Sequence, residues 1–300
     1  MGGAVDQINA VLSSRGLSAP NGGSVLVGLA GRGIQLSRTP AMHEREAHRL
    51  GLPYSYVLLD FDRMGLPDSE IGNVIAAAAS IGFRGLNITH PFKQMAIAAM
   101  DEMSPEAAAI GAMNTAVFNQ GHRTGHNTDS WGYAESFREG MAAAPMGHVS
   151  IFGAGGAGAA VAYALMEHGA GQLSIIDSDP ARAIALAQRM RQTFGARVIA
   201  APDAAVAVLQ ADGVVNTTPV GMAKYPGTPF DTALLTPDKW VSDIIYFPPE
   251  TELLRQARSL GCRTLPGIGM AIYQAVRAFE LFSGRKADRT AMAGHFEAAA

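Results

Sequence analysis

The sequence predicts an α/β protein of two domains, each built around a mainly parallel β-sheet. Its 300 residues are twice the roughly 150 residues of an ordinary domain. Short apolar segments that suit buried strands alternate along the chain with longer helical patterns, which is typical of βαβ units and parallel sheets. At His148 this alternation starts again with a strand and a glycine-rich turn. We therefore expect one domain over residues 1–130 and a second that begins at residue 131.

The first 130 residues carry a regular series of strand and helix patterns. Strands are expected at residues 25–29, 54–60, 85–88 and 114–118, and a helix at residues 69–81, while residues 18–24 suit a flexible lead-in. Further helices are expected to open at Pro40 (after a hydroxyl cap), Pro91 and Pro105, because a first turn has no use for the N–H that proline lacks. Lys93 would then lie in a first turn, where the helix dipole disfavours a cation. Its ammonium is therefore expected to be solvated or held by an acid elsewhere. A polar turn at residues 125–129 leads into a helix near Trp131.

The second half of the chain repeats the alternation more regularly. Strands are expected at residues 149–152, 173–176, 197–200, 213–215 and 241–246. Helices are expected at residues 159–168, 181–193, 250–260 and 270–282. This order of elements predicts a doubly wound sheet with helices between successive strands.

Composition excludes several kinds of protein. A hydrophobic fraction of 48% with a charged fraction of 16% describes a globular chain, and a net charge of −3 gives no reason to expect nucleic acid or a membrane surface as partner. The one cysteine, Cys262, allows no intrachain disulfide and indicates a reducing cytoplasm. We see no signal peptide in residues 1–24, no apolar run near the ~20 residues of a membrane span, and no histidine spacing for a metal. The chain is expected to act as a monomer or homodimer.

A dinucleotide site is predicted at Gly153-Ala-Gly-Gly-Ala-Gly158. This turn follows a strand and opens a helix, and Asp177 ends the next strand about 20 positions later, as the dinucleotide fingerprint requires. The first glycine allows the tight turn, the second lets the backbone approach a pyrophosphate, and the third lets helix and strand pack closely. The cofactor-binding residues expected here are Gly153, Ala154, Gly155, Gly156, Ala157 and Gly158. The alternative is a tight strand-to-helix turn that binds nothing.

Asp177 also bears on the choice of cofactor. A carboxylate here accepts both ribose hydroxyls of NAD but repels the 2′-phosphate of NADP, at ~4 kcal/mol per unit charge for a separation of ~4 Å and a dielectric of ~20. Arg182 lies close enough in sequence to soften that repulsion. NAD is therefore expected as the main cofactor and NADP as a secondary one. The alternative for Asp177 is a simple helix cap.

The first domain offers side chains for a small acid with several hydroxyl groups. Hydroxyls and amides are expected in its loops, together with one lysine and one acid that can exchange a proton. These residues are Ser37, Thr39, Asn87, Thr89, Asn114, Lys93 and Asp129.

Six motifs in this chain resemble those of the shikimate/quinate dehydrogenase family. They are residues 37–43 (SRTPAMH), 87–93 (NITHPFK), 111–115 (GAMNT), 125–129 (GHNTD), 216–222 (NTTPVGM) and 267–274 (GIGMAIYQ), and they follow the family's order from about residue 25 to 284. The resemblance implies that Lys93 and Asp129 form the catalytic pair. It implies that Ser37 and Thr39 bind a substrate carboxylate, and that Asn87, Thr89, Asn114 and Gln274 bind hydroxyls. It also implies that residues from about 270 to 300 return to the first domain, which leaves residues 131–269 as the Rossmann domain.

Further contacts are expected in the late motifs. Thr217, Thr218, Pro219, Gly267 and Met270 are expected to contact the cofactor. Tyr246 is expected either to touch substrate or nicotinamide or to serve packing alone.

The resemblance is strongest to one branch of the family. Many biosynthetic members have serine at both hydroxyl positions of the first motif and a basic stretch after the second Rossmann strand. This chain has Thr39 and Asp177-Ser-Asp179 at those places, as the NAD-preferring branch that takes quinate as well as shikimate does. The implied reaction interconverts shikimate with 3-dehydroshikimate, and quinate with 3-dehydroquinate.

The implied mechanism predicts a pH dependence. Lys93 would exchange the proton on the oxygen that is oxidised, and a lysine ammonium is a ready donor to a ketone but a poor base toward an alcohol. Alcohol oxidation should therefore quicken as the pH rises. The alternatives are a related enzyme such as an aminoshikimate dehydrogenase, a non-catalytic sensor that keeps the fold, and a two-domain folate dehydrogenase.

Overall fold

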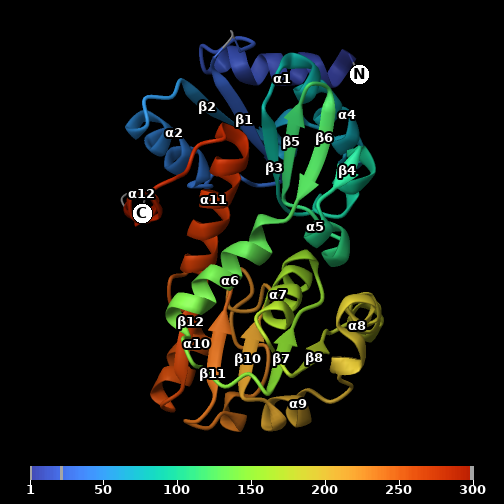
Figure 1. The fold of residues 1–300 in the computed structure, drawn as a ribbon, viewed down its shortest axis with the longest axis vertical. Helices are drawn as coiled ribbons and strands as arrows, with labels where there is room; N and C mark the ends of the chain where they lie inside the picture. The colour runs from blue at the N-terminus through green and yellow to red at the C-terminus, as the bar shows by residue number, and fades with distance from the viewer. Residues whose placement is uncertain (1, 21–22, 298–300) are drawn as a thin grey trace. The chain divides into compact units, whose positions relative to one another are not determined.

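The computed structural model describes residues 2–20 and 23–297, so part of the expected lead-in at residues 18–24 lies outside the described residues. The chain forms two compact units (Figure 1). The first comprises Met1–Ala108, Ala112–Thr128 and Ala275–Ala300, and the second comprises Ala109–Gly111 and Asp129–Gln274.

The first unit contains a six-stranded sheet in the order β2-β1-β3-β5-β6-β4. Its strands are β1 (Val25–Gly31), β2 (Tyr54–Asp60), β3 (Gly85–Ile88), β4 (Glu102–Met103), β5 (Thr115–Asn119) and β6 (His122–His126). Strand β1 pairs in parallel with β2 and β3, whereas β5 pairs antiparallel with both β3 and β6. Residues 119–122 close a short hairpin, which has no room for the helix that a parallel connection requires.

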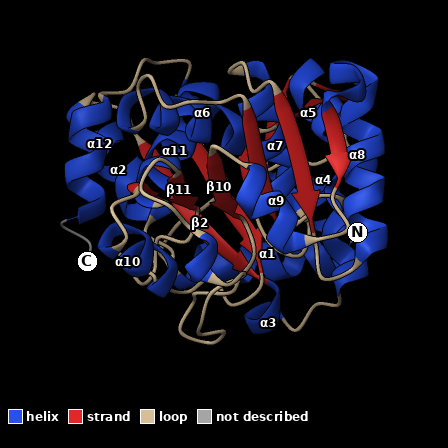
Figure 2. Cartoon of the chain, turned by 90° about the horizontal axis from the view of Figure 1, so that it is seen from below, coloured by secondary structure: helices blue, strands red, loops and turns tan. Residues whose placement is uncertain are grey.

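The other helices of the first unit are drawn in Figures 1 and 2. They are α1 (Gly2–Ser14), α2 (Thr39–Arg49), α3 (Phe61–Met64), α4 (Ile71–Ile81) and α12 (Arg289–Glu297), together with the 3₁₀-helices η1 (Asp68–Glu70) and η2 (Met95–Ala99). Three helices run from one unit into the other: α5 (Pro105–Ile110), α6 (Thr128–Gly140) and α11 (Ile268–Ser283). The apolar faces of α1 and α4 cover the core formed by β1, β2 and β3.

Two expectations about this unit are wrong. No α-helix opens at Pro91, because residues 91–94 form turns in which the N–H of Phe92 donates to the carbonyl of Thr89 at 2.8 Å, and η2 follows. Phe92 is fully buried beside Phe61, with a ring-centroid distance of 4.3 Å. Lys93 therefore lies in a turn, and the helix-dipole argument does not apply to it. Helix α2 does form, but it begins at Thr39, and the N-cap position is held by Arg38, whose side chain makes no capping hydrogen bond.

The second unit contains a parallel sheet in the order β12-β11-β10-β7-β8-β9 (Figure 1). Its strands are β7 (His148–Phe152), β8 (Gln172–Ile176), β9 (Val198–Ala200), β10 (Gly213–Asn216), β11 (Trp240–Asp243) and β12 (Arg263–Pro266). Its helices are α7 (Gly156–Glu167), α8 (Pro180–Phe194), α9 (Ala204–Gln210) and α10 (Glu252–Ser259), with the 3₁₀-helices η3 (Gly195–Arg197) and η4 (Thr232–Leu234). The strand order reverses between β7 and β10, where a doubly wound fold binds its ligand.

Both units thus have α/β architecture with mainly parallel pairing, and the predicted fold class is confirmed. Among the described residues, no helix is long and apolar enough to cross a membrane.

Candidate active site

The glycine-rich turn after β7 has the geometry of a phosphate cradle. Gly153 has a φ of +106°, which side chains with a Cβ rarely adopt. A Cβ at Gly158 would lie 2.0 Å from the carbonyl oxygen of Gly153, so only glycine allows α7 to start this close to the turn. Gly155 precedes α7 and offers no side-chain cap, so the first N–H groups of the helix have no capping partner from that residue. This turn fits the pyrophosphate of a dinucleotide.

Asp177 lies directly after β8 and is bound to that turn. Its Oδ2 accepts the N–H of Ala154 at 2.7 Å, and its Oδ1 accepts the N–H of Asp179 at 2.9 Å. The side chain is 6% exposed, and Arg182 Nη1 lies 3.9 Å from Oδ1 with the arginine side chain 54% exposed. Asp179, not Asp177, caps α8. The carboxylate of Asp177 thus ties the end of β8 to the glycine-rich turn.

A buried hydrogen-bond network holds the loop after β10. Asn216 Oδ1 accepts the N–H of Thr218 at 3.0 Å and its hydroxyl at 2.7 Å, while Asn216 Nδ2 donates to Asp243 Oδ1 at 3.1 Å. Asp243 is fully buried and also accepts the hydroxyl of Thr251 at 2.7 Å. Burial raises the pKa of Asp243, and these donors oppose the rise. The network fixes residues 217–219 beside the glycine turn, where the Thr217 hydroxyl donates to the carbonyl of Gly153 at 2.9 Å.

The remaining predicted residues of the second unit follow β11 and β12. A Cβ at Gly267 would lie 2.2 Å from the carbonyl oxygen of Ile244, so the start of α11 passes directly over the end of β11. Met270 is 8% exposed, and Gln274 Nε2 donates to the carbonyl of Ala271 at 3.1 Å. Tyr246 is 49% exposed in the loop that follows β11.

Two buried amides organise the predicted hydroxyl-binding residues of the first unit. Asn87 Oδ1 accepts the hydroxyl of Tyr56 at 2.8 Å, and its Nδ2 donates to Thr115 Oγ1 at 3.0 Å. Asn114 Oδ1 accepts the N–H of Thr128 at 2.7 Å and the hydroxyl of Thr115 at 3.0 Å. Thr115 therefore links the two amides, which are 5% and 3% exposed. Such a connected network fixes the direction in which each amide can meet a ligand.

Ser37 and Thr39 lie at the entrance to α2. The hydroxyl of Ser37 accepts the N–H of Thr39 at 3.4 Å. The loop before them is held by Asp60, which accepts hydrogen bonds from Gln35 Nε2 at 2.8 Å and the Gly33 N–H at 3.2 Å. Burial alone would raise the pKa of Asp60, but these hydrogen bonds outweigh it and lower the pKa. The predicted carboxylate-binding segment is thus built on a fixed loop.

Thr89 and Lys93 lie in the turn after β3, and Asp129 lies near the start of α6. The N–H of Thr89 continues the sheet by donating to the carbonyl of Ala30 at 3.0 Å. The carbonyl of Lys93 accepts the N–H of Met113 at 2.9 Å, which fixes the main chain of Lys93 next to Asn114. Asp129 follows Thr128, the residue that Asn114 holds, and is 6% exposed. The amide network thus reaches Thr128, the chain neighbour of Asp129, while the carbonyl of Lys93 is held by Met113, the chain neighbour of Asn114.

The comparisons with known proteins decide the family. Residues 29–116 match the family model described as shikimate dehydrogenase substrate binding domain, and residues 267–294 match the shikimate 5′-dehydrogenase C-terminal domain. The chain is 51% identical to a shikimate dehydrogenase (NADP(+)) of Streptomyces avermitilis, over 90% of this chain and 94% of that one. The chain belongs to the shikimate dehydrogenase family. The members of this family are oxidoreductases with a nicotinamide cofactor.

Other relatives of this chain within the shikimate dehydrogenase family are named for NAD. A quinate/shikimate dehydrogenase (NAD(+)) of Corynebacterium efficiens is 49% identical over 92% of this chain and 99% of the relative. The solved structure of quinate dehydrogenase from Corynebacterium glutamicum in complex with NAD has a TM-score of 0.87 at 46% identity, covering 92% of this chain and 99% of that one. Relatives of similar identity are thus named for NADP and for NAD.

Sequence reasoning missed the residues that hold the predicted site residues in place. Thr115 and Thr128 stand inside motifs that were recognised, but only the structure connects them through the two amides. Tyr56 and Asp243 lie within strand patterns and look like ordinary members of a buried strand. The available signal was a polar side chain in an otherwise apolar strand, since a buried polar group needs a partner.

Proposed function

We propose that this chain interconverts shikimate and 3-dehydroshikimate, and also quinate and 3-dehydroquinate, with Lys93 and Asp129 as the acid–base pair. The observation that carries the proposal is the hydrogen bond of 2.9 Å from the Met113 N–H to the Lys93 carbonyl. It fixes the main chain of the predicted proton carrier beside the buried amides that are expected to orient the hydroxyls. The domain assignment is part of the proposal: residues 1–130 and about 270–300 bind the substrate, and residues 131–269 bind the dinucleotide.

In the proposed reaction, NAD held by the turn at residues 153–158 would supply the hydride acceptor for oxidation of the alcohol carbon. Lys93 accepts the proton of that alcohol during oxidation and returns one during reduction of the ketone. Asp129 is the proposed partner of Lys93 in this proton exchange. The amides of Asn87 and Asn114, with Thr89 and Gln274, orient the hydroxyls, while Ser37 and Thr39 donate to the carboxylate. The turn at residues 153–158 holds the cofactor's phosphates through backbone N–H groups.

We propose NAD as the preferred cofactor and NADP as a secondary one. The support is the carboxylate of Asp177, whose position after β8 is fixed by the Ala154 N–H at 2.7 Å. Like charges ~4 Å apart cost ~4 kcal/mol at a dielectric of ~20, so even a quarter of that favours NAD several-fold. The half-exposed Arg182, 3.9 Å from the carboxylate, is the group that would let NADP bind at all.

Initial rates of oxidation of shikimate and of quinate, each with NAD and with NADP, test the reaction and both preferences. We expect turnover of both acids, faster with NAD. D177N should raise kcat/KM for NADP relative to NAD, and R182Q should lower it. T39S should shift the ratio of kcat/KM for quinate to that for shikimate toward shikimate.

Substitution of Lys93 tests the proton transfer. K93M should lower kcat by ~10²–10⁴-fold and remove the rise in the oxidation rate between pH 7 and pH 10. Tight binding of shikimate without turnover by the wild-type chain would refute the enzyme and favour a sensor. A wild-type rate that is flat over this pH range, with chemistry limiting, would refute the role of Lys93 alone.

A further inference from the structure

The C-terminal helix α12 lies side by side with α2 in the first unit (Figures 1 and 2). Helix α2 begins with the segment to which the proposed function assigns the substrate carboxylate. The start of α12 lies near the end of α2, and the end of α12 lies near the start of α2, so the two helices are antiparallel. Met292 and Phe296, one helical turn apart on α12, are 0% and 5% exposed.

Helix α2 binds the first turn of α12 through a buried acid. Glu46 is fully buried, and its Oε1 accepts the N–H of Asp288, directly before α12, at 2.8 Å. Arg49 holds the same carboxylate through two hydrogen bonds of 2.8 and 2.9 Å. Asp288 in turn caps α12, because its Oδ1 accepts the N–H of Ala291 at 3.0 Å. The negative charge of Glu46 therefore lies at the positive end of the α12 dipole.

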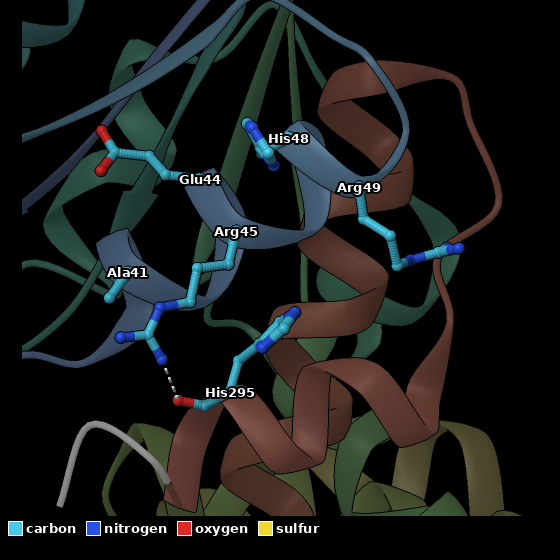
Figure 3. A pocket seen from close by; sticks show the side chains of 6 residues that line it. All are labelled: Ala41, Glu44, Arg45, His48, Arg49 and His295. Carbon is cyan, nitrogen blue, oxygen red and sulfur yellow. Dashed lines mark hydrogen bonds between the residues drawn. The ribbon is translucent and has the colours of Figure 1, made fainter.

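Helix α2 binds the last turn of α12 through two arginines. Arg45 Nη1 donates to the carbonyl of His295 at 3.4 Å, the dashed contact in Figure 3. Arg38 Nη1 donates to the carbonyl of Phe296 at 3.5 Å, and its guanidinium lies 5.2 Å from the centre of the Phe296 ring. Both cations complement the negative end of the helix dipole. Each end of the α12 dipole thus lies next to a side chain of opposite charge from Glu46, Arg45 or Arg38.

An open groove of about 530 Å³ borders α2 and α12 (Figure 3). Its arginine and glutamate side chains already have partners: Arg45 binds α12, Arg49 binds Glu46, and Glu44 Oε1 accepts from Arg15 at 3.2 Å. Figure 3 also shows these side chains pointing in different directions from the helix, without a common centre. Arg45 thus serves the contact between α2 and α12 directly and Arg49 serves it through Glu46, and none of the groove's lining residues is a predicted site residue.

We propose that α12 is a clasp that positions the carboxylate-binding segment of the substrate site. Arg38 stands between Ser37 and Thr39 in the chain, so its contact with Phe296 fixes both hydroxyl residues at the entrance to α2. A segment that is ordered before the ligand arrives binds it more tightly, because less conformational entropy is lost on binding. Arg38 and Phe296 are positioning residues here. This inference rests on the proposed assignment of Ser37 and Thr39 to the carboxylate.

The test compares R38M and F296L of the full chain with the wild type. F296L keeps apolar volume and the charge of Arg38 but removes the ring under the guanidinium. We expect KM and the calorimetric Kd for shikimate to rise roughly tenfold in either variant, equivalent to about 1.4 kcal/mol, with kcat and the KM for NAD unchanged. The double variant should be no worse than either single one, because both act on one contact. Hydrogen exchange of residues 37–42 should accelerate in both. T290A, an exposed site of α12, is the control and should change none of these quantities.

S37A separates the failure of the clasp from the failure of the assignment on which it rests. A raised KM in S37A together with an unchanged KM in R38M and F296L would overturn the clasp alone. An unchanged KM in S37A would overturn the carboxylate assignment, and the clasp with it as a positioning element. If F296L fails to fold, R38M decides, since Arg38 is partly exposed and its substitution leaves the core intact.

Discussion

The stability of the first unit should fall in mild acid because of one buried histidine. His43 of α2 is fully buried, with its ring between those of Tyr56 and Phe279 at centroid distances of 5.0 and 5.6 Å. Its Nδ1 shares a hydrogen bond of 2.9 Å with the hydroxyl of Tyr54, and its Nε2 has no hydrogen-bond partner among the described residues. Burial lowers the pKa of His43 from 6.5 to about 3, although the carbonyl of Ala275 opposes the shift.

The sign and size of the effect follow from proton linkage. Between pH 6.5 and pH 3 the unfolded chain protonates this imidazole and the folded chain does not, so acid favours unfolding. The free energy of unfolding therefore loses about 1.4 kcal/mol per pH unit below the unfolded pKa. Between pH 7 and pH 5 the loss from His43 alone amounts to about 2 kcal/mol. Above pH 7 the group contributes almost no pH dependence.

Denaturant unfolding of the wild type and of H43F at pH 7 and pH 5 measures this contribution. We expect the wild type to lose about 2 kcal/mol more than the variant between the two values. His48, exposed on the same helix, supplies the control H48N, which should keep the wild-type dependence. NMR titration of labelled His43 gives the most direct check. A midpoint near pH 6.5 would refute the lowered pKa of His43, because its buried aromatic surroundings would then accept the charged imidazolium.

Three further substitutions test the supports of the site. G158A should abolish measurable NAD binding and cost about 1–3 kcal/mol of stability, because its Cβ would lie 2.0 Å from a backbone oxygen. The control G72A, whose Cβ would meet nothing within 4 Å, should leave NAD binding intact. Fluorescence titration with NAD and thermal unfolding measure both variants. Y56F should destabilise the chain by about 1–2 kcal/mol and raise KM for shikimate but not for NAD, because it removes the donor at 2.8 Å from Asn87 Oδ1; steady-state kinetics and denaturant unfolding show either effect. D243N should raise KM for NAD and leave KM for shikimate unchanged, because the new amide nitrogen would face the donors of Asn216 and Thr251. Equal effects on both KM values would refute the idea that Asp243 supports only the loop after β10.

Local patterns predicted the elements that their own residues determine. The strand at residues 54–60 and most helix positions followed from apolar periodicity, and the turn at residues 153–158 followed from its glycines. The predictions failed where distant partners decide. The turn at residues 91–94 depends on the burial of Phe92 against Phe61. Strand β6 (His122–His126) was missed for a local reason, because its sequence HRTGH lacks the apolar alternation that predicts a strand.

The sequence predicts some residues of the candidate site and leaves others unrecognised. Groups expected to meet the ligand stand in short motifs, because a turn or a helix start must present them. Groups that hold those residues lie elsewhere in the chain: Tyr56 supports Asn87 from two strands away, and Phe296 supports Arg38 across 258 positions. Helix α12 was not predicted because its apolar face is short. Both of its ends are stabilised by charged residues in and directly before α2, which lie far away in the sequence. The motifs therefore identify the predicted site, whereas the contacts that hold its residues come from other parts of the chain.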